Sequence, residues 1–354
     1  MTEQDQLSKL TRLCERAPSR PAFEALIEQA IAMWETDPKD ADSRGLAVLR
    51  ACLNAWYAQR PVEYDPDYWA EPALLEDPFA LKWRDIWPSL CSGTEQVERD
   101  EAADLSEWPT PICADAEHHS WMRLVRSLRI DADDFGGLDF HLFGQATNLR
   151  PEHLAIDLPN PDTDFDRDAF FAFPNFARLR SLCFSGFRFS PDNLRALIEP
   201  LTASLERLSM AFNFDRGDAI AAALANNPHI TSLSVLDLAK SGLGDEGCER
   251  LAASAFSGSL REFYGASNRI GDAGLAALAR GPWLANTEKL ILHDNQIGDA
   301  GVRALAKSPH LGRLEKLSLF NNPVTVDGVD ALLASPYVGP DVLESLQTLR
   351  ERLG

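Results

Sequence analysis

The strongest constraint on the fold of this chain is a phrase that occurs three times, at a fixed period, between Leu260 and Leu333. Its copies read LREFYGASNRIGDAGLAALA, TEKLILHDNQIGDAGVRALA and LEKLSLFNNPVTVDGVDALL, and their shared asparagines are Asn268, Asn295 and Asn322. A fixed period of this kind is typical of repeat architectures, in which one copy cannot bury its apolar face alone. We therefore expect the copies to stack side by side.

Each copy predicts a strand, a turn and a short helix. The alternating leucines favour a strand with one buried face. The side-chain amide of the asparagine can satisfy backbone groups where the chain turns out of the strand. Gly-Asp then ends the strand and starts a helix, with the aspartate expected as its N-cap. On this register the helices begin near Arg167, Pro191, Gly217, Asp245, Asp272, Asp299 and Asp327.

The same register extends backwards as far as Val125. The positions equivalent to the asparagines follow one another at nearly equal steps and hold Asp133, Pro161, Phe187, Asn213 and Ser241. About eight coils are therefore expected, and the first two or three are degenerate. Terminal repeats are atypical because they shield the open ends of the core.

These residues resemble leucine-rich repeats, and the period with a full helix resembles the ribonuclease-inhibitor-like subclass. The segment ALAKSPHLGRLEKLSLFNNPV and the tail LQTLRERLG are similar to a large bacterial group of cytoplasmic leucine-rich proteins. The resemblance is closest over residues 233–354, weaker over 125–232, and absent before residue 120. It implies an α/β solenoid with parallel strands on the concave face, helices on the convex face, and a role in binding a protein partner.

Three regions are expected along the chain. Residues 1–90 form a helical N-terminal region, 91–120 a linker-like acidic segment, and 121–354 the solenoid, closed by a capping helix in PDVLESLQTLRERLG. In the first region, helices are expected over 2–16, from Pro21 to Trp34 and over 46–56, and PFALKWRDIWPSL favours another. Seven of the eight tryptophans lie between residues 34 and 121, which indicates a folded unit.

The charge and the cysteines bound the function. A net charge of −20 argues against nucleic acid and anionic membrane surfaces as partners, since both are bound largely through Lys and Arg. The acidity serves solubility or attracts a basic partner. Six cysteines without paired spacing fit a reducing compartment. The polar first residues and the lack of a long apolar run predict a cytoplasmic protein.

The sequence contains few candidate catalytic or metal-binding residues. Cys113, His118 and His119, with Cys91 as a distant fourth ligand, lack the paired spacing of structural zinc sites. Gly-Asp-Ala-Gly is explained by the repeat, and neither G-x-S-x-G nor H-E-x-x-H occurs. Cys183 is interpreted as an unreactive strand residue, because nothing near it in sequence would lower its pKa. We expect no catalytic residue, cofactor or metal, although a site assembled across coils stays open.

The residues between the strand leucines face the concave side and form columns, because neighbouring strands lie ~4.8 Å apart. Two columns are expected to form one exposed patch of aromatic and aliphatic side chains near the C-terminal end, with charges around it. An apolar centre with a charged rim is typical of interfaces, although isolated exposed apolar residues are also ordinary. The predicted partner-binding residues are Tyr264, Ile291, His293 and Phe320, rimmed by Glu262, Lys289, Asp294 and Lys316.

The interpretation is a non-enzymatic protein-interaction module that binds a protein of unknown identity on the concave face of the solenoid. The alternative is an enzyme or regulator. A ubiquitin-ligase-like protein would need a catalytic cysteine such as Cys52 or Cys91, and a GTPase-activator-like protein an exposed arginine such as Arg129. A third possibility is a purely architectural protein, a spacer or oligomerisation scaffold without a discrete ligand. The oligomeric state is left open.

Overall fold

The computed structural model describes residues 3–14, 25, 29, 81–82, 127–130, 152–157, 172–173, 175–187 and 189–353. The chain forms two compact units. One comprises Met1–Ala155 and Phe165–Asn175, and the other Ile156–Asp164 and Phe176–Gly354. The boundaries predicted at residues 90 and 120 lie outside the described residues and stay predictions.

The first unit contains α1 (Glu3–Cys14), β1 (Leu81–Lys82) and β2 (Ser127–Ile130), and β3 (His153–Asp157) begins in it. The predicted first helix is confirmed, and it buries Leu10 and Leu13. Ala25 and Gln29 are helical, as the second predicted helix requires, while the rest of that helix and the third one lie outside the described residues.

The helix predicted for PFALKWRDIWPSL is wrong at Leu81 and Lys82, which form strand β1. β1 pairs in parallel with β2, with Leu81 opposite Leu128. A strand partner far along the chain supplies ladder hydrogen bonds that local helical spacing does not reveal, and such tertiary context overrides weak helix propensity.

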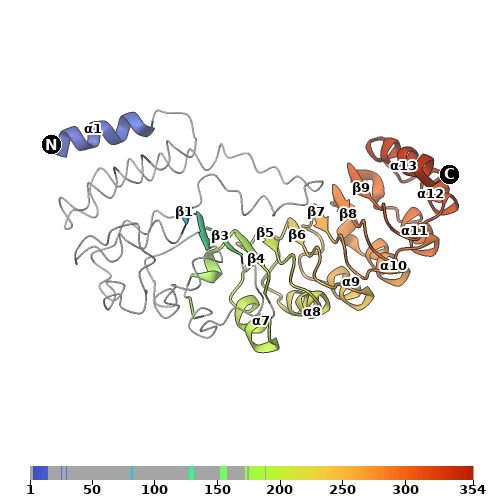
Figure 1. The fold of residues 1–354 in the computed structure, drawn as a ribbon, viewed down its shortest axis with the longest axis horizontal. Helices are drawn as coiled ribbons and strands as arrows, with labels where there is room; N and C mark the ends of the chain where they lie inside the picture. The colour runs from blue at the N-terminus through green and yellow to red at the C-terminus, as the bar shows by residue number, and fades with distance from the viewer. Residues whose placement is uncertain are drawn as a thin grey trace, which may run out of the picture. The chain divides into compact units, whose positions relative to one another are not determined.

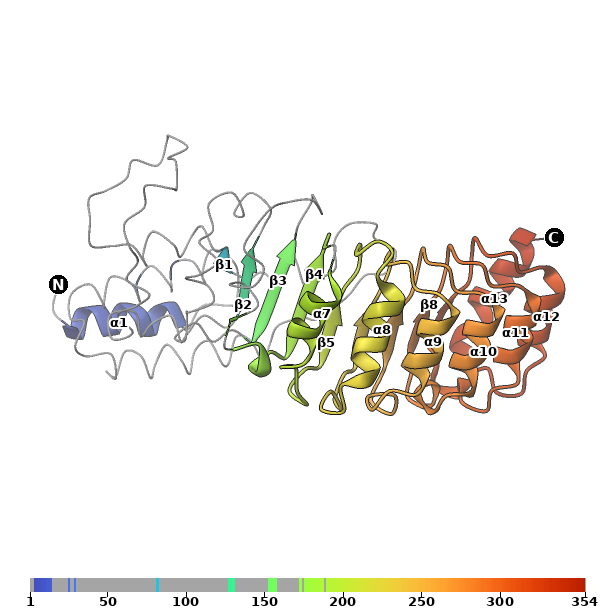
Figure 2. The same cartoon turned by 90° about the horizontal axis from the view of Figure 1, so that it is seen from below.

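The second unit is an α/β solenoid in which strands and helices alternate (Figure 1). Each strand pairs in parallel with the next one along the chain. The strands line the concave face and the helices the convex face, where they lie side by side (Figure 2). The strands are β4 (Ser181–Ser185), β5 (Arg207–Ser209), β6 (Val235–Asp237), β7 (Glu262–Tyr264), β8 (Lys289–Ile291) and β9 (Lys316–Ser318).

The helices begin where the repeat predicts. The starts at Pro191, Gly217, Asp245, Asp272 and Asp299 are confirmed, the last begins at Val326 instead of Asp327, and Arg167 lies outside the described residues. Short 3-10 helices cover Phe176–Arg178, Pro282–Ala285 and Leu311–Arg313. The α-helices are α7 (Pro191–Ile198), α8 (Gly217–Asn226), α9 (Asp245–Ala252), α10 (Asp272–Arg280), α11 (Asp299–Ala306), α12 (Val326–Leu333) and α13 (Pro340–Leu353).

The core of the second unit repeats with the same period as the sequence. On the helix side, a column of leucines contributes one member from each coil, and no member is more than 5 % exposed. On the strand side, the predicted inward-facing leucines at 236, 238, 290, 292, 317 and 319 are at most 6 % exposed. Each coil therefore seals the apolar face of its neighbour. The helix column is Leu224, Leu251, Leu278, Leu305 and Leu332.

The last coil has no following coil, and α13 takes its place. This helix contacts α12 and β9 and buries Val342 and Leu346, while Leu343 and Leu349 are half-buried. The predicted capping helix is confirmed.

Candidate interaction surface

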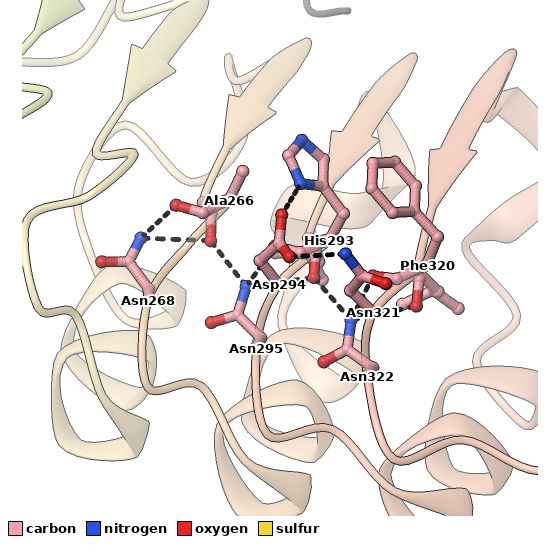
Figure 3. A network of polar contacts seen from close by, with 11 residues as sticks. Ala266, Asn268, His293, Asp294, Asn295, Phe320, Asn321 and Asn322 are labelled. Carbon is pink, nitrogen blue, oxygen red and sulfur yellow. Dashed lines mark hydrogen bonds and ion pairs between the residues drawn. The ribbon is translucent and has the colours of Figure 1, made fainter. Parts of the chain in front are cut away.

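A column of asparagines fixes the edge where the strands end. In one coil, the Asn295 Nδ2 donates to the carbonyls of Gly265 at 2.8 Å, Leu292 at 3.0 Å and His293 at 3.2 Å, and its Oδ1 accepts from the Ile270 N–H at 3.0 Å. The asparagines one coil before and one coil after repeat these contacts (Figure 3). Each amide therefore ties its own turn to the preceding one, as predicted.

The residue before each member of this column adopts the left-handed conformation, with φ between 53° and 60°. A non-glycine residue there costs of order 1 kcal/mol and persists only where the surroundings hold it. The hydrogen bonds of the following residue supply that restraint. The left-handed residues are Phe212, Lys240, Ser267, Asp294 and Asn321, and they form a column along the edge of the inner face.

The aspartate of each Gly-Asp pair caps the helix of the next coil, so the prediction that it caps its own helix is wrong. Asp272 is the first residue of α10, yet its Oδ1 accepts from the N–H groups of Gly298 at 2.7 Å and Gly301 at 2.8 Å at the start of α11. Asp218 and Asp245 make the same pair of bonds one coil onward. The stacking of coils brings the next helix terminus closer to the carboxylate than its own helix terminus.

The aspartate is replaced by another residue in the first and the last of these helices. Asp299 reaches Thr325 at the start of α12, but the equivalent residue of the last coil is Val326, and the described chain has no further repeat helix for it to cap. At the other end the equivalent residue is Pro191, and α7 is capped from within its own coil by the Ser190 Oγ at 3.1 Å.

The predicted columns on the concave strands are confirmed by the strand register. Glu262 lies opposite Lys289, which lies opposite Lys316, and Tyr264 lies opposite Ile291 in the same way. The Lys289 Nζ is 3.4 Å from the Glu262 Oε1, so the column of Glu262, Lys289 and Lys316 contains an ion pair between adjacent strands.

The predicted exposure of the apolar group is wrong for most of its members. Tyr264 and Ile291 are each 2 % exposed and His293 is 8 % exposed, whereas Phe320 is half-buried. Side chains one strand apart lie in contact and cover one another. The Tyr264 hydroxyl donates to the Glu262 Oε2 at 2.6 Å, and burial, followed by this hydrogen bond, raises the pKa of Tyr264 well above its usual value.

His293 and Phe320 form a stacked pair at the edge of the concave face (Figure 3). Their ring centroids are 4.3 Å apart and the planes differ by 6°. The His293 Nδ1 lies 2.7 Å from the Asp294 Oδ2, and the Asn321 Nδ2 donates to the Asp294 Oδ1 at 2.8 Å. Burial acts to raise the pKa of Asp294, but these two bonds, together with electrostatic attraction from His293 and Lys240, lower it on balance.

A buried polar pair on the neighbouring strands β5 and β6 was not predicted from the sequence. The Ser209 Oγ donates to the Asp237 Oδ2 at 3.1 Å, and the Asp237 Oδ1 accepts from the Ala239 N–H at 2.9 Å. Both Ser209 and Asp237 are 1 % exposed. The signal was available, because the two residues are neighbours in the predicted column and a serine can satisfy a carboxylate.

Some of the residues considered as catalytic or metal-binding candidates lie in the described part of the chain. Among the described residues, Cys183 and Cys248 are buried, and burial, followed by the negative charges of Asp245 and Asp218, raises the pKa of Cys248. No group of three or more His, Cys, Asp or Glu is placed to hold a metal ion in the described part of the chain. Arg129 lies in β2. Residues Cys52, Cys91, Cys113, His118 and His119 lie outside the described residues.

Three segments of the chain match the family described as Leucine Rich repeat, at residues 227–252, 266–279 and 288–306. They cover the coils whose register is most regular. These three segments carry leucine-rich repeats. Within the described residues, no helix is both long and apolar enough to cross a bilayer.

Two solved structures are similar to the chain at low sequence identity. An internalin (inlF) from Listeria monocytogenes is 16 % identical with a TM-score of 0.38, covering 60 % of this chain and 68 % of that one. The complex of Rad7 and Elc1 from yeast gives 14 % identity and a TM-score of 0.42, covering 87 % of this chain and 75 % of that one. No curated protein matches the sequence.

Proposed function

We propose that this leucine-rich repeat protein is a non-enzymatic interaction module that holds a protein partner on the concave face of its solenoid. The observation that carries the proposal is the stacked pair of His293 and Phe320 on the strand side. The half-buried Phe320 ring stacks on the buried His293 ring and points away from the helices (Figure 3). Aromatic side chains placed in this way are frequent anchors of protein interfaces.

Half-buried charges of both signs lie on the same strands: Asp294 contacts His293, and Glu262, Lys289 and Lys316 are the first residues of β7, β8 and β9. The buried Tyr264 and Ile291 form the base of the same surface. An apolar centre with a mixed polar rim fits a protein better than a polyanion, which would need an excess of cations. The net charge of −20 supports the same choice against nucleic acid and anionic membranes.

The proposal also covers the lack of enzymatic activity, the repeat subclass, the origin and the cellular location of the protein. A non-enzymatic role is supported by Cys248, because a buried thiol with a raised pKa is a poor nucleophile. The fixed period with complete helices supports the ribonuclease-inhibitor-like subclass, and the similarity of the tail supports a bacterial origin. The scattered cysteines support a cytoplasmic location.

The test is capture of partners from the source cell by the full chain, quantified by mass spectrometry. We compare wild type, Phe320→Ala, and Glu249→Ala, which removes an exposed side chain from helix α9 on the opposite face. Partners that are lost with Phe320→Ala and kept with Glu249→Ala support the concave face. Equal recovery from all three removes this surface from the proposal, provided that circular dichroism shows each variant folded.

A further inference from the structure

A groove runs between the neighbouring helices α7 and α8 on the convex side of the solenoid (Figure 2). Its volume is about 650 Å³, within the range of about 300–1,000 Å³ that is typical of small-molecule sites. It lies wholly within the second unit, on the face opposite to the proposed concave surface. The contact between α7 and α8 is less extensive than the contact between the later pairs of adjacent helices from α8 to α12.

The sequence gives a physical cause for this groove. In the helices from α9 to α12, the residue that faces the capping aspartate of the preceding coil is a glycine, and a Cβ there would collide with that aspartate. The equivalent residue of α8 is Ile220, and the aspartate position of α7 holds Pro191. The close approach of the later helices is therefore not possible for α8, and space is left beside α7. The glycines are Gly247, Gly274, Gly301 and Gly328.

The walls of the groove are apolar along its length. On the α7 side they are formed by Leu194, Ile198 and the Phe189 ring, each of which is at most 4 % exposed. On the α8 side they are formed by small side chains on one face of the helix, which leave the groove open to solvent. These side chains are Ala219, Ala222 and Ala223.

The end of the groove where both helices finish is closed by Asn227. Its Nδ2 donates to the carbonyls of Ile198 at 2.7 Å and Leu201 at 3.1 Å, so it joins the two helices. Glu199 lies at this end too and disfavours an anion there. The Arg195 guanidinium on the rim does not offset it, because it is held on its own helix, 3.2 Å from the Asp192 Oδ1 and 3.9 Å from the Glu199 Oε1.

Arg216 lines the opposite end of the groove, where both helices begin. In the described part of the chain its guanidinium makes no ion pair, since both nearby carboxylates are already bound. Asp215 is paired with Arg269 at 3.1 Å, and the Asp218 Oδ1 accepts from the N–H of Gly244 at 2.7 Å in the next coil. The groove therefore offers one available cation at one end and hydrocarbon along the rest of its length.

This arrangement selects the class of occupant. Because α7 and α8 still touch, a third helix, about 10 Å across, cannot enter between them. An extended peptide would set its backbone N–H and C=O groups against alanine and leucine side chains, which cannot hydrogen-bond to them. An alkyl chain has no such groups, and a carboxylate matches a guanidinium in shape and charge. We infer that the groove binds a long-chain carboxylate, with the alkyl chain along the apolar walls and the head group at Arg216.

The experiment titrates the delipidated full chain with octanoate, decanoate and laurate below their critical micelle concentrations, by isothermal titration calorimetry. Saturable binding to a single site is expected, strengthened about twofold to fourfold by each added methylene group. Ala222→Leu fills the groove and weakens binding of all three acids about tenfold or more. The matched control is Ala276→Leu, at the equivalent half-buried position of α10, where the adjacent helices pack closely, and it leaves the affinity unchanged.

A second pair of variants tests the head group. Arg216→Gln weakens decanoate binding about tenfold and leaves decanol binding unchanged, because only the acid contacts the guanidinium. Arg280→Gln removes another exposed arginine and changes neither affinity. Equal affinity for decanoate and decylamine overturns the inference, as does an Arg216→Gln variant that binds decanoate like wild type. So does binding that is not saturable, or that a folded Ala222→Leu variant does not weaken, with folding checked by circular dichroism.

Native mass spectrometry of the chain purified from its source cell tests the other occupants. A bound long-chain acid that is absent from Ala222→Leu supports the inference. A dimer that this variant converts to monomer assigns the groove to a second copy, and a co-purified polypeptide that it loses assigns the groove to a protein. Either result overturns the inference. Phe320→Ala leaves decanoate binding unchanged, so this site and the concave-face proposal are tested separately.

Discussion

The cross-coil aspartate cap makes a prediction that a conventional cap does not. Replacing Asp272 in α10 should loosen the first turn of α11, one coil further along. Its Oδ1 accepts two backbone N–H groups, at 2.7 Å from Gly298 and 2.8 Å from Gly301. Loss of an N-cap side chain costs about 0.5–2 kcal/mol, and a hydrogen bond to a charged acceptor contributes about 1.5–3 kcal/mol. Both bonds are only partly buried, so we expect Asp272→Ala to lower the free energy of unfolding by about 2–3 kcal/mol.

Asp272→Asn separates charge from geometry. Because one oxygen accepts both bonds, the amide oxygen of asparagine can replace it, and only the charge assistance is lost. That substitution should cost about 1 kcal/mol. The control is Asp327→Ala in the first turn of α12, where the exposed carboxylate has no further repeat helix to cap in the described chain and acts mainly on the helix dipole. It should cost less than about 1 kcal/mol.

Two measurements check this prediction. Urea unfolding followed by circular dichroism gives the order of stabilities, and hydrogen exchange read by mass spectrometry locates the effect. Peptides covering α11 should lose protection in Asp272→Ala before those covering α10. The reasoning is refuted if Asp272→Ala is as mild as Asp327→Ala, or if α10 is loosened while α11 keeps its protection.

Three further predictions concern the same repeat. Gly301→Ala should lower the free energy of unfolding by about 2 kcal/mol or more, because the new Cβ would lie 2.7 Å from the Asp272 Oδ1 of the preceding coil. Gly258→Ala is the control: its Cβ would have nothing within 4 Å, so the same urea assay should show a neutral or slightly stabilising effect. Asn295→Ala should lower the free energy of unfolding by about 2–4 kcal/mol, because it leaves buried backbone groups without hydrogen bonds. Asn295→Asp should not restore this stability, because the carboxylate lacks the N–H donors of the amide. An aspartate variant with the same Tm as wild type in thermal unfolding would disprove this role of the amide. Hydrogen bonds from the backbone N–H and the hydroxyl of Thr325 in the following coil hold the pKa of Asp299 below its ordinary value. Protonation of Asp299 therefore favours the unfolded chain, and its contribution to stability is lost as the pH falls below about 4. Asp299→Asn should flatten the dependence of Tm on pH in that range, and an unchanged slope would contradict the assignment.

Much of the fold could be predicted because a fixed period determines the register. Once the asparagines are aligned, the leucine alternation places each strand, and Gly-Asp places each helix start within one residue. The strand columns follow as well, which is why Glu262, Lys289 and Lys316 were correctly placed as neighbours. The sequence outside the regular repeats offers no such alignment, and the helix predicted around Leu81 was wrong for that reason.

The burial of the concave residues could not be predicted in the same way. Alternation indicates which face of a strand a side chain occupies, but how far neighbours cover it depends on the rotamers of large side chains. Tyr264 illustrates this, because its hydroxyl turns back to Glu262 and the residue is almost entirely buried. The direction of the aspartate caps was also beyond a rule derived from single helices. The signal that could have revealed it is the replacement of the aspartate by Val326 in the last coil.

A strict repeat makes every departure informative, since each one must be compensated by the structure or serve another purpose. Ser241 departs from asparagine, and its coil is compensated because the Asn268 Oδ1 also accepts from the Ser241 N–H and the Ser241 carbonyl accepts from the N–H groups of Arg216 and Gly217. Phe187 departs too, and its ring stacks within a buried aromatic cluster while the Asn213 Oδ1 accepts its N–H. Ile220 departs from the glycine of the later helices, and the space beside α7 stays open as the groove. Among these departures it is therefore the one whose explanation is best sought in a ligand.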